Sequence, residues 1–346
     1  MTSANRQHEA REREALRLDG ISVVLDGREV LRVDELAVGR GEVVAVLGPN
    51  GSGKSTLLRV AALLQQPTAG NTSLFSEQPR RSGQRTQLRR RTASAFAGAM
   101  LLDMSVRANV ETALRIHGVN GDERHSRATR WLDRLGVLDR ADARAHTLSA
   151  GEAQRASLAR AFAVEPELIF LDEPFSALDI DTRSRLVGEL RELLPAEGVA
   201  AMLATHDRTE ARLMADRVAI LLDGRIEQQG PADEVFAQPR TRAAAAFLGY
   251  SVIAGELLNG QRGEAASDAP MACIPPDATE LVDAQMSGAR PASVLAVQGA
   301  AGHAQVVVDI GAPLTLETTI ERVQGGDLRA GAAVHVRIDE QRVVWL

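Results

Sequence analysis

Residues 48–56 read GPNGSGKST in this chain of 346 residues. They fit the pattern G-x-x-x-x-G-K-[ST] and lie between an apolar run, EVVAVL at 42–47, and a helical pattern that we expect from Lys54 to about Gln65. A buried strand, a glycine-rich turn and a helix in this order let backbone N–H groups surround a phosphate while the positive end of the helix points at it. The stretch therefore predicts an α/β domain that binds a nucleotide.

The side chains of this loop predict how a nucleotide and its metal ion are held. Lys54 is the only lysine among 40 basic residues, and a phosphate-binding loop uses a compact ammonium rather than a planar guanidinium to reach the β- and γ-phosphates. We expect Ser55 to bind Mg²⁺ and Thr56 to hold the nucleotide on the side of its α- and β-phosphates. The other residues that we expect at the phosphates are Gly48, Pro49, Asn50, Gly51, Ser52 and Gly53.

A second motif supplies acidic groups for nucleotide hydrolysis. The run LIFL at 168–171 predicts a buried strand, and Asp172 and Glu173 follow at its carboxyl end, where open α/β sheets bind ligands. We expect Asp172 to hold Mg²⁺ through water and Glu173 to act as the general base that activates the attacking water. A turn or cap carboxylate is the alternative, but the phosphate loop upstream favours the catalytic interpretation.

Ser149 and Glu152 fit the S-x-x-E pattern of a capping box, ahead of a helix that we expect to run to about Val164. The helix start is enough to explain both residues. A helix N-terminus is also an anion site, so the structural and the functional interpretations coincide here.

The chain pattern predicts two domains. Apolar runs at 168–171, 199–204 and 218–222 alternate with helical patterns, which indicates a mostly parallel sheet with helices on both faces. After about Tyr250 the sequence becomes β-rich, as in HAQVVVD at 303–309, and predicts a small barrel of the oligonucleotide- or oligosaccharide-binding type.

We therefore expect a charged tail, an α/β nucleotide-binding domain with antiparallel and helical subdomains, and an all-β domain. Their expected bounds are 1–14, 15–242 and 243–346.

The composition excludes several classes of protein. With 40 basic against 46 acidic side chains the net charge is −6, which gives no general attraction to nucleic acid or to an anionic lipid surface. The single cysteine forms no internal disulfide, which suits a reducing compartment. The N-terminal residues lack the apolar core of a signal peptide, and no apolar stretch is long enough to span a bilayer.

Taken together, the motifs resemble those of the ATP-binding subunit of an ABC transporter, over residues 16 to about 240. Beside the phosphate loop (Walker A), the resemblance rests on LSAGE at 148–152 (the signature), LIFLDE at 168–173 (Walker B), SALD at 176–179 (the D-loop) and the switch residue His206 in ATHD. The resemblance implies a head-to-tail dimer in which ATP, with Mg²⁺, lies between Walker A of one subunit and the signature of the other.

In such a dimer Ser149 and Gly151 contact the γ-phosphate in trans, with Glu152 and Asp179 beside them, and His206 contacts the γ-phosphate and orients the water. The implied partners are a second ATPase subunit, an integral membrane permease and, indirectly, a solute-binding protein. The implied location is peripheral, at the cytoplasmic face of the membrane.

Three positions depart from the family pattern. Leu25 stands where an aromatic residue usually stacks on adenine, Ala97 where a glutamine follows Phe96, and Ala150 at the second glycine-pair position of the signature. Ala97 and Ala150 predict weakened hydrolysis or coupling, while nucleotide binding is unaffected.

The C-terminal residues 251–346 resemble the small β-barrel appended to importer ATPases for oxyanions, iron, polyamines and sugars. Residues 306–338 look most like the version in molybdate or tungstate importers, although Asp339-Glu340 replaces an expected lysine-alanine pair. Two alternatives remain: a nucleotide-binding regulatory module with weak hydrolysis, and a soluble ABC ATPase outside transport.

Overall fold

The computed structural model describes residues 14–96, 98–259, 270–300, 303–319 and 328–346. Contacts divide the chain into two compact units, Met1–Val235 and Phe236–Leu346, which are described separately. The expected boundary between residues 242 and 243 falls at the start of helix α10 (Arg242–Phe247), inside the second unit.

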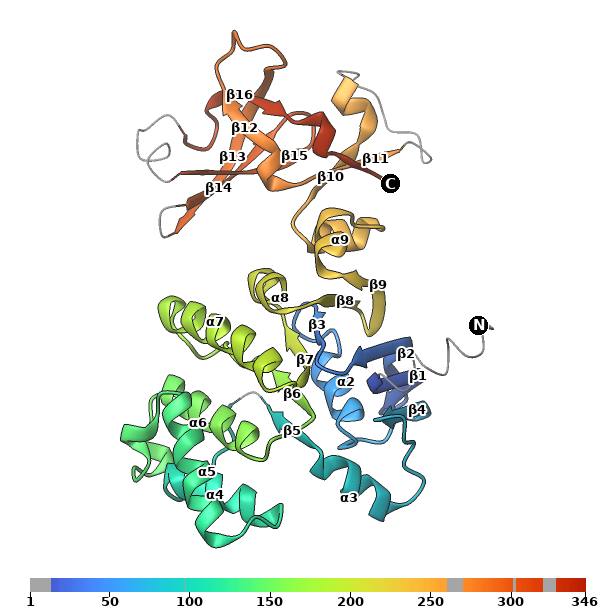
Figure 1. Cartoon of the computed structure of the whole chain (residues 1–346). Coiled ribbons are helices and arrows are strands. Elements are labelled where there is room, and N and C mark those ends of the chain that lie inside the picture. The colour runs from blue at the N-terminus through green and yellow to red at the C-terminus, as the bar shows by residue number, and fades with distance from the viewer. Residues whose placement is uncertain (1–13, 97, 260–269, 301–302, 320–327) are drawn as a thin grey trace. The chain divides into compact units, whose positions relative to one another are not determined.

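A nine-stranded sheet forms the centre of the first unit, in the order β4-β1-β2-β9-β8-β3-β7-β6-β5 (Figure 1). The pairs β5–β6, β6–β7, β7–β3 and β3–β8 are parallel, whereas β1 pairs with β2 and β4, and β8 with β9, in antiparallel fashion. The strands are β1 (Glu14–Leu25), β2 (Arg28–Gly39), β3 (Val43–Leu47), β4 (Ala69–Leu74), β5 (Thr92–Ala95), β6 (Leu168–Asp172), β7 (Ala200–Thr205), β8 (Arg217–Leu222) and β9 (Arg225–Pro231).

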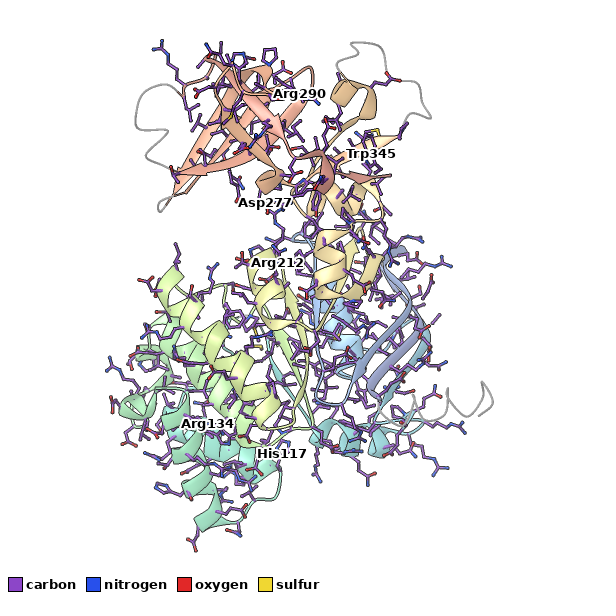
Figure 2. All side chains as sticks on the ribbon, turned by 45° about the horizontal axis from the view of Figure 1, so that its top comes forward. His117, Arg134, Arg212, Asp277, Arg290 and Trp345 are labelled. Atoms are coloured by element: carbon purple, nitrogen blue, oxygen red, sulfur yellow. The ribbon has the colours of Figure 1, made fainter. Side chains whose placement is uncertain are left out.

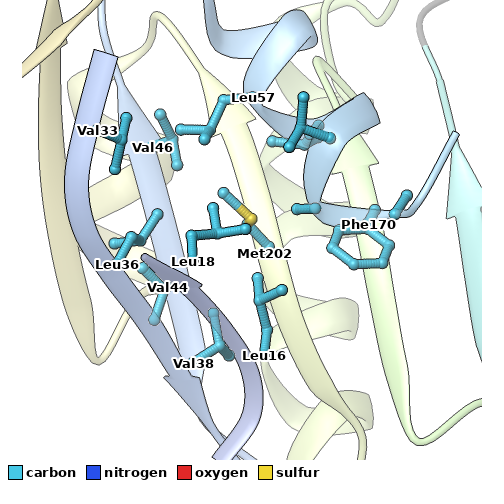
Figure 3. Packing of buried hydrophobic residues seen from close by; sticks show 14 of the residues in the cluster. Leu16, Leu18, Val33, Leu36, Val38, Val44, Val46, Leu57, Phe170 and Met202 are labelled. Carbon is cyan, nitrogen blue, oxygen red and sulfur yellow. The ribbon is translucent and has the colours of Figure 1, made fainter. Parts of the chain in front are cut away.

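Buried apolar strands explain the parallel part of the sheet. Every residue of β3, β6 and β7 is buried, as expected when helices cover both faces of a sheet. Figure 3 shows how Leu57 of helix α2 (Lys54–Ala61), Phe170 of β6 and Met202 of β7 pack with apolar side chains of β1 and β2. The predicted mostly parallel α/β domain is confirmed.

The β1–β2 hairpin turns at Asp26-Gly27, where both residues have positive φ angles, 50° and 78°. An Asp-Gly pair favours this kind of tight turn because glycine accepts the left-handed region without strain. This turn joins β1 and β2 into an antiparallel pair.

The helices of the first unit flank this sheet (Figure 1). They are α2 (Lys54–Ala61), α3 (Ser82–Arg90), α4 (Val106–Ile116), α5 (Gly121–Arg134), α6 (Ala150–Ala163), α7 (Ile180–Ala196) and α8 (Arg208–Met214). Helix α9 (Ala232–Ala237) spans the boundary between the two units. Trp131 of α5 stacks on Phe162 of α6 with 5.3 Å between ring centroids. This contact packs the two helices against each other.

The helix after the phosphate loop is shorter than predicted. Helix α2 ends at Ala61, four residues before Gln65, because Leu63 takes a left-handed φ of 58°. Apolar periodicity continues through Leu63 and Leu64, so the sequence pattern did not reveal the break.

The second unit contains two sheets, one of three strands (β10-β11-β17) and one of five (β12-β16-β13-β14-β15). Strands β12 and β15, the two edges of the larger sheet, lie against each other, so this sheet curls towards a barrel. The strands are β10 (Ser251–Ala254), β11 (Met271–Ile274), β12 (Thr279–Val282), β13 (Arg290–Ala300), β14 (His303–Asp309), β15 (Pro313–Thr319), β16 (Ala333–Ile338) and β17 (Val344–Trp345). The prediction of a small all-β domain is confirmed.

Figure 2 shows the side chains of both units, of which the second carries three Arg–carboxylate pairs on its surface: Arg290–Glu340, Arg337–Glu280 and Arg342–Asp277. Among the described residues, every helix is too short or too polar to cross a lipid bilayer.

Candidate functional site

Two glycines, Gly48 and Gly53, shape the phosphate loop. A Cβ atom on Gly48 would lie 2.2 Å from the carbonyl oxygen of Leu221. Gly53 has a φ of 102° and lies directly before α2, without a side chain that could cap the helix. The backbone N–H groups at the start of α2 are therefore left for a ligand, as in an anion-binding helix terminus.

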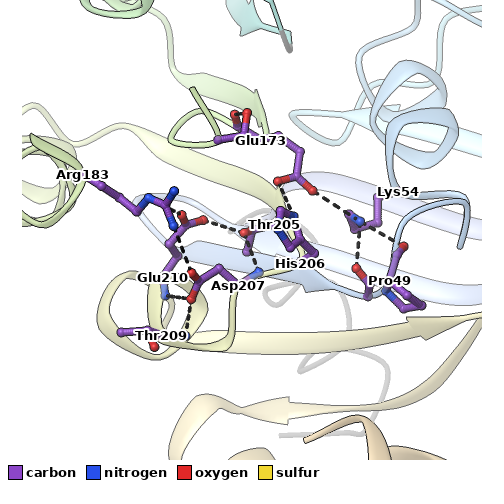
Figure 4. A network of polar contacts seen from close by, with 11 residues as sticks. Pro49, Lys54, Glu173, Arg183, Thr205, His206, Asp207, Thr209 and Glu210 are labelled. Carbon is purple, nitrogen blue, oxygen red and sulfur yellow. Dashed lines mark hydrogen bonds and ion pairs between the residues drawn. The ribbon is translucent and has the colours of Figure 1, made fainter. Parts of the chain in front are cut away.

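Lys54, the first residue of α2, is 6% exposed and is held by the loop itself. Its Nζ atom donates hydrogen bonds to the carbonyl oxygens of Gly48 (2.8 Å) and Pro49 (3.1 Å) and lies 3.4 Å from Oε1 of Glu173 (Figure 4). A buried ammonium needs such partners. The structure thus brings the Walker A lysine and the predicted general base together.

Asp172 ends β6 and is 3% exposed. Burial raises the pKa of its carboxyl group, and a hydrogen bond with the side chain of Ser55 opposes this shift. Its Oδ1 atom has no hydrogen-bond partner, which is costly for a buried carboxyl group.

A buried carboxylate oxygen without a partner, beside a serine hydroxyl, fits a divalent cation that takes its remaining ligands from water and phosphate, as Mg²⁺ does. Within the described residues, no cluster of three or more histidine, cysteine or acidic side chains could hold a metal ion by itself.

Glu173 and His206 form a pair in front of the loop. The Nδ1 atom of His206 lies 2.8 Å from Oε2 of Glu173 (Figure 4). Glu173 has a left-handed φ of 49°, and its N–H donates to the carbonyl oxygen of Ala204 at 2.9 Å. A non-glycine residue held in this region is strained, and such strain clusters at functional sites.

A second group of predicted residues lies in a pocket of the first unit, of about 580 Å³. Signature residues Ser149, Ala150, Gly151 and Glu152 line it together with Asp179, the N-cap of α7, whereas no residue of 48–56 does. The phosphate loop and the signature are thus two separate surfaces of the described chain.

The predicted capping box is confirmed at the start of α6. The Ser149 hydroxyl accepts the N–H of Glu152 at 3.3 Å, and Glu152 accepts the N–H of Ser149 at 2.8 Å. This backbone hydrogen bond, followed by one from Arg140, lowers the pKa of Glu152. Glu152 therefore helps to cap the N-terminus of α6.

Of the three departures from the family pattern, two can be located in the structure. Leu25, at the end of β1, is 48% exposed, and Ala150 is the first residue of α6. The hairpin that carries Leu25 packs on the phosphate loop, since a Cβ on Gly53 would lie 3.2 Å from the carbonyl oxygen of Val30. Ala97 lies outside the described residues.

Sequence reasoning missed three residues of the polar network that holds the chain next to His206: Thr205, Glu210 and Arg183 (Figure 4). Thr205 precedes the histidine and Glu210 follows it by one helical turn, which is a local signal that could have drawn attention to both. Arg183 comes from another helix, α7, and only the fold reveals it.

Comparisons with known proteins agree with this geometry. Residues 31–176 match the sequence profile of the ABC transporter family. A phosphate import ATP-binding protein of Natronomonas pharaonis is 37% identical over 249 residues, 69% of this chain and 87% of that protein. An Fe(3+) ions import ATP-binding protein of Streptomyces avermitilis is 39% identical over 75% of this chain and 74% of its own length.

A molybdate/tungstate import ATP-binding protein of Thermococcus kodakarensis is 36% identical over 71% of this chain and 74% of that protein. Among solved structures, a dimeric ATP-binding cassette in a post-hydrolysis state, bound to ADP and Pi, is similar with a TM-score of 0.59 and 28% identity. The match covers 63% of this chain and 98% of that one.

Proposed function

Since the chain belongs to the ABC transporter family, as an ATP-binding subunit of importer type, we propose that it hydrolyses ATP at Lys54, Glu173 and His206 to drive import of an inorganic oxyanion. The observation that carries the catalytic part is the arrangement around Glu173, whose two carboxylate oxygens face Lys54 at 3.4 Å and His206 at 2.8 Å. The Glu173 carboxylate thus lies between the Lys54 ammonium, which suits phosphate, and the His206 imidazole.

Within this proposal, Ser55 and Asp172 hold Mg²⁺ with the nucleotide phosphates. The support is the partnerless Oδ1 of Asp172 beside the Ser55 hydroxyl. When bound there, Mg²⁺ would supply positive charge that neutralises the charge developing on the transferred phosphate. Thr56, which follows Ser55 in α2, holds the nucleotide on the side of its α- and β-phosphates.

Glu173 accepts the proton of the attacking water, and His206 orients that water and the γ-phosphate. An ionised carboxylate only accepts hydrogen bonds, so the hydrogen between Glu173 and His206 is carried by Nδ1 of the imidazole. This bond fixes the ring orientation. Lys54 stabilises the charge of the γ-phosphate and leaves Glu173 when the phosphates enter.

The second half of each site comes from another subunit in this proposal. Ser149 and Gly151, with Asp179 beside them, line a pocket apart from the phosphate loop, so one chain alone does not enclose a nucleotide. A head-to-tail pair would bring the two surfaces together. The dimeric cassette with ADP and Pi among the similar structures supports this arrangement.

For the transported solute we propose an oxyanion of the molybdate or tungstate type. Support comes from relatives that are named as import proteins for phosphate, molybdate/tungstate and sulfate/thiosulfate, and from the curled β-domain after residue 250. Relatives named for Fe(3+) ions and spermidine/putrescine provide the competing solutes. The partners are then a membrane permease at whose cytoplasmic face the chain docks and a solute-binding protein.

Two measurements test the proposal. Phosphate release by the purified chain, compared with the Glu173→Gln variant, tests hydrolysis. If the chain binds ATP tightly but releases no phosphate, alone or with its permease, it is the regulatory module suggested by Ala97 and Ala150. Uptake of labelled molybdate, tungstate, ferric iron and spermidine by cells with and without the chain tests the solute. Loss of iron or spermidine uptake alone would overturn the oxyanion assignment.

A further inference from the structure

A separate set of polar contacts holds the two residues that flank His206 in the sequence, Thr205 and Asp207 (Figure 4). Thr205, the last residue of β7, is fully buried, and its hydroxyl donates a hydrogen bond of 2.5 Å to Oε2 of Glu210. The same hydroxyl accepts the backbone N–H of Asp207 at 3.0 Å. His206 is the residue between Thr205 and Asp207, so the threonine side chain closes a turn around it.

Thr205 is also tied to the phosphate loop. Its carbonyl oxygen accepts the N–H of Gly48 at 3.2 Å. This hydrogen bond fixes the backbone just before His206 relative to the phosphate loop. The position of the histidine then depends on what holds the Thr205 hydroxyl and the residues that follow.

Glu210 is a buried carboxyl group that the proposed hydrolysis does not use. It is 5% exposed, and burial raises its pKa. Burying a carboxyl group is costly unless hydrogen bonds and charges compensate it. Here the compensation comes from Thr205 and from Arg183 of α7, whose Nε lies 3.9 Å from Oε1 of Glu210.

Arg183 extends the network to the D-loop. Its Nη1 lies 3.4 Å from Oδ2 of Asp207, and its Nη2 donates to the carbonyl oxygen of Leu178 at 3.3 Å. Leu178 lies in the pocket that also contains the signature residues. One guanidinium therefore contacts the turn after His206 and the segment beside the proposed dimer surface.

We infer that Glu210 and Arg183 are positioning residues for ATP hydrolysis, which hold Thr205 and the following turn so that His206 keeps its 2.8 Å contact with Glu173. The inference rests on the proposed roles of Glu173 and His206. Since none of the three residues Thr205, Glu210 and Arg183 contributes a side chain to the phosphate loop, loosening them affects the chemical step and leaves ATP binding intact.

The test compares substitutions that differ in one hydrogen bond. Thr205→Val keeps the side-chain shape and removes the hydroxyl, and Thr205→Ser restores it. Glu210→Leu removes the acceptor, whereas Glu210→Gln keeps an acceptor oxygen. The matched control is Thr92→Val in β5, because Thr92 is also buried and its hydroxyl donates to the carbonyl oxygen of Arg89 at 3.1 Å, away from His206.

For the full chain, we expect Thr205→Val and Glu210→Leu to lower kcat by about 10–100-fold, as a small misplacement of a reacting group does, with ATP affinity changed less than about threefold. Thr205→Ser and Glu210→Gln should recover most of kcat. Thr92→Val should lose comparable thermal stability and keep its kcat.

Two results would overturn the inference. One is an unchanged kcat in both Thr205→Val and Glu210→Leu. The other is a parallel fall in kcat, ATP affinity and melting temperature that Thr205→Ser does not reverse, which is the behaviour of a merely structural contact. Glu173→Gln is measured alongside: if it keeps wild-type turnover, the proposed function itself fails, whatever the Thr205 variants do.

Discussion

Nζ of Lys54 lies 3.4 Å from Oε1 of Glu173, so the only lysine of the chain is paired with the carboxylate that follows Walker B. The lysine side chain is 6% exposed, and the carboxylate side chain is 16% exposed. Without phosphates the two charges satisfy each other. In the proposed mechanism, the γ-phosphate would pair with the lysine when it enters and leave the carboxylate to accept a hydrogen bond from a water molecule. Nucleotide binding would then activate the base.

Glu173→Gln should bind ATP and lose turnover by about 100-fold or more, since an amide cannot accept the proton of the attacking water. We also expect the variant to accumulate an ATP-bound dimer, visible by size-exclusion chromatography with and without ATP. The conservative variant Glu173→Asp, with a shorter carboxylate, should retain part of the activity. A wild-type hydrolysis rate in Glu173→Gln would contradict the assignment of the base.

The buried carboxyl of Asp172 should make the stability of the free chain depend on pH. Burial raises the pKa of Asp172 in the folded state, so ionisation costs folding free energy. Stability should therefore fall as pH rises from about 3.9, the ordinary aspartate value, through the raised pKa. Without Mg²⁺ or nucleotide, Asp172→Asn should be more stable than wild type at pH 7, with the gain shrinking towards pH 4.

Melting temperatures of the two proteins across this pH range check the prediction. The exposed residue Asp133 provides the control, because Asp133→Asn should show no such trend. Mg²⁺ with ATP should reverse the order at pH 7 and stabilise wild type above Asp172→Asn. Identical pH profiles for wild type and Asp172→Asn would contradict the argument.

Glu167 should stabilise the first unit at neutral pH. It accepts hydrogen bonds from Nε (2.6 Å) and Nη2 (3.0 Å) of Arg91, which lower its pKa, and a weaker contribution comes from Arg40. A lowered pKa contributes stability above the unfolded-state value, and this stability is lost as pH falls through the folded-state pKa.

Because the Glu167 side chain is 42% exposed, Glu167→Gln should cost no more than about 1 kcal/mol at pH 7. Urea unfolding at pH 7 and at a pH below the folded-state pKa checks this, and the difference should vanish at the lower pH. Glu192→Gln, on the exposed side of α7, is the control and should be neutral at both.

Trp131 should be the most sensitive position of the helical layer. It is 1% exposed and stacks on Phe162. Trp131→Ala would leave a large cavity and should lower the free energy of unfolding by about 3–5 kcal/mol, whereas Trp131→Phe should lose less. Urea denaturation followed by circular dichroism measures both, and equal losses would show that ring packing is not the cause.

Ala97→Gln should raise basal ATPase activity by roughly 5–150-fold, corresponding to one regained positioning contact of about 1–3 kcal/mol, with ATP affinity nearly unchanged. The expectation follows from the family resemblance, in which a glutamine after Phe96 contacts the metal or the water. Steady-state ATPase and nucleotide affinity are measured in parallel, alone and with the permease. Unchanged turnover in both settings would show that Ala97 is not where hydrolysis or coupling weakened.

Features that depend on neighbouring residues were predictable from sequence. The loop 48–56, the Ser149–Glu152 capping box and the strand His303–Asp309 each follow from a few adjacent positions. Backbone torsions, caps and side-chain alternation are set within one or two turns of chain, so the sequence predicted their type and place. Even there, the end of α2 at Ala61 escaped, because one left-handed residue interrupts a continuing apolar pattern.

What only the tertiary structure decided is which distant residues meet. Glu173 reaches both Lys54 and His206 because β6, β7 and β3 are adjacent parallel strands whose carboxyl ends lie at one edge of the sheet. Arg183 reaches Glu210 because α7 and α8 pack together. Sequence spacing carries no information on strand order or helix packing, which result from burial of apolar surface over the whole domain. The residue types of the site were therefore determined by the sequence, and their pairing by the fold.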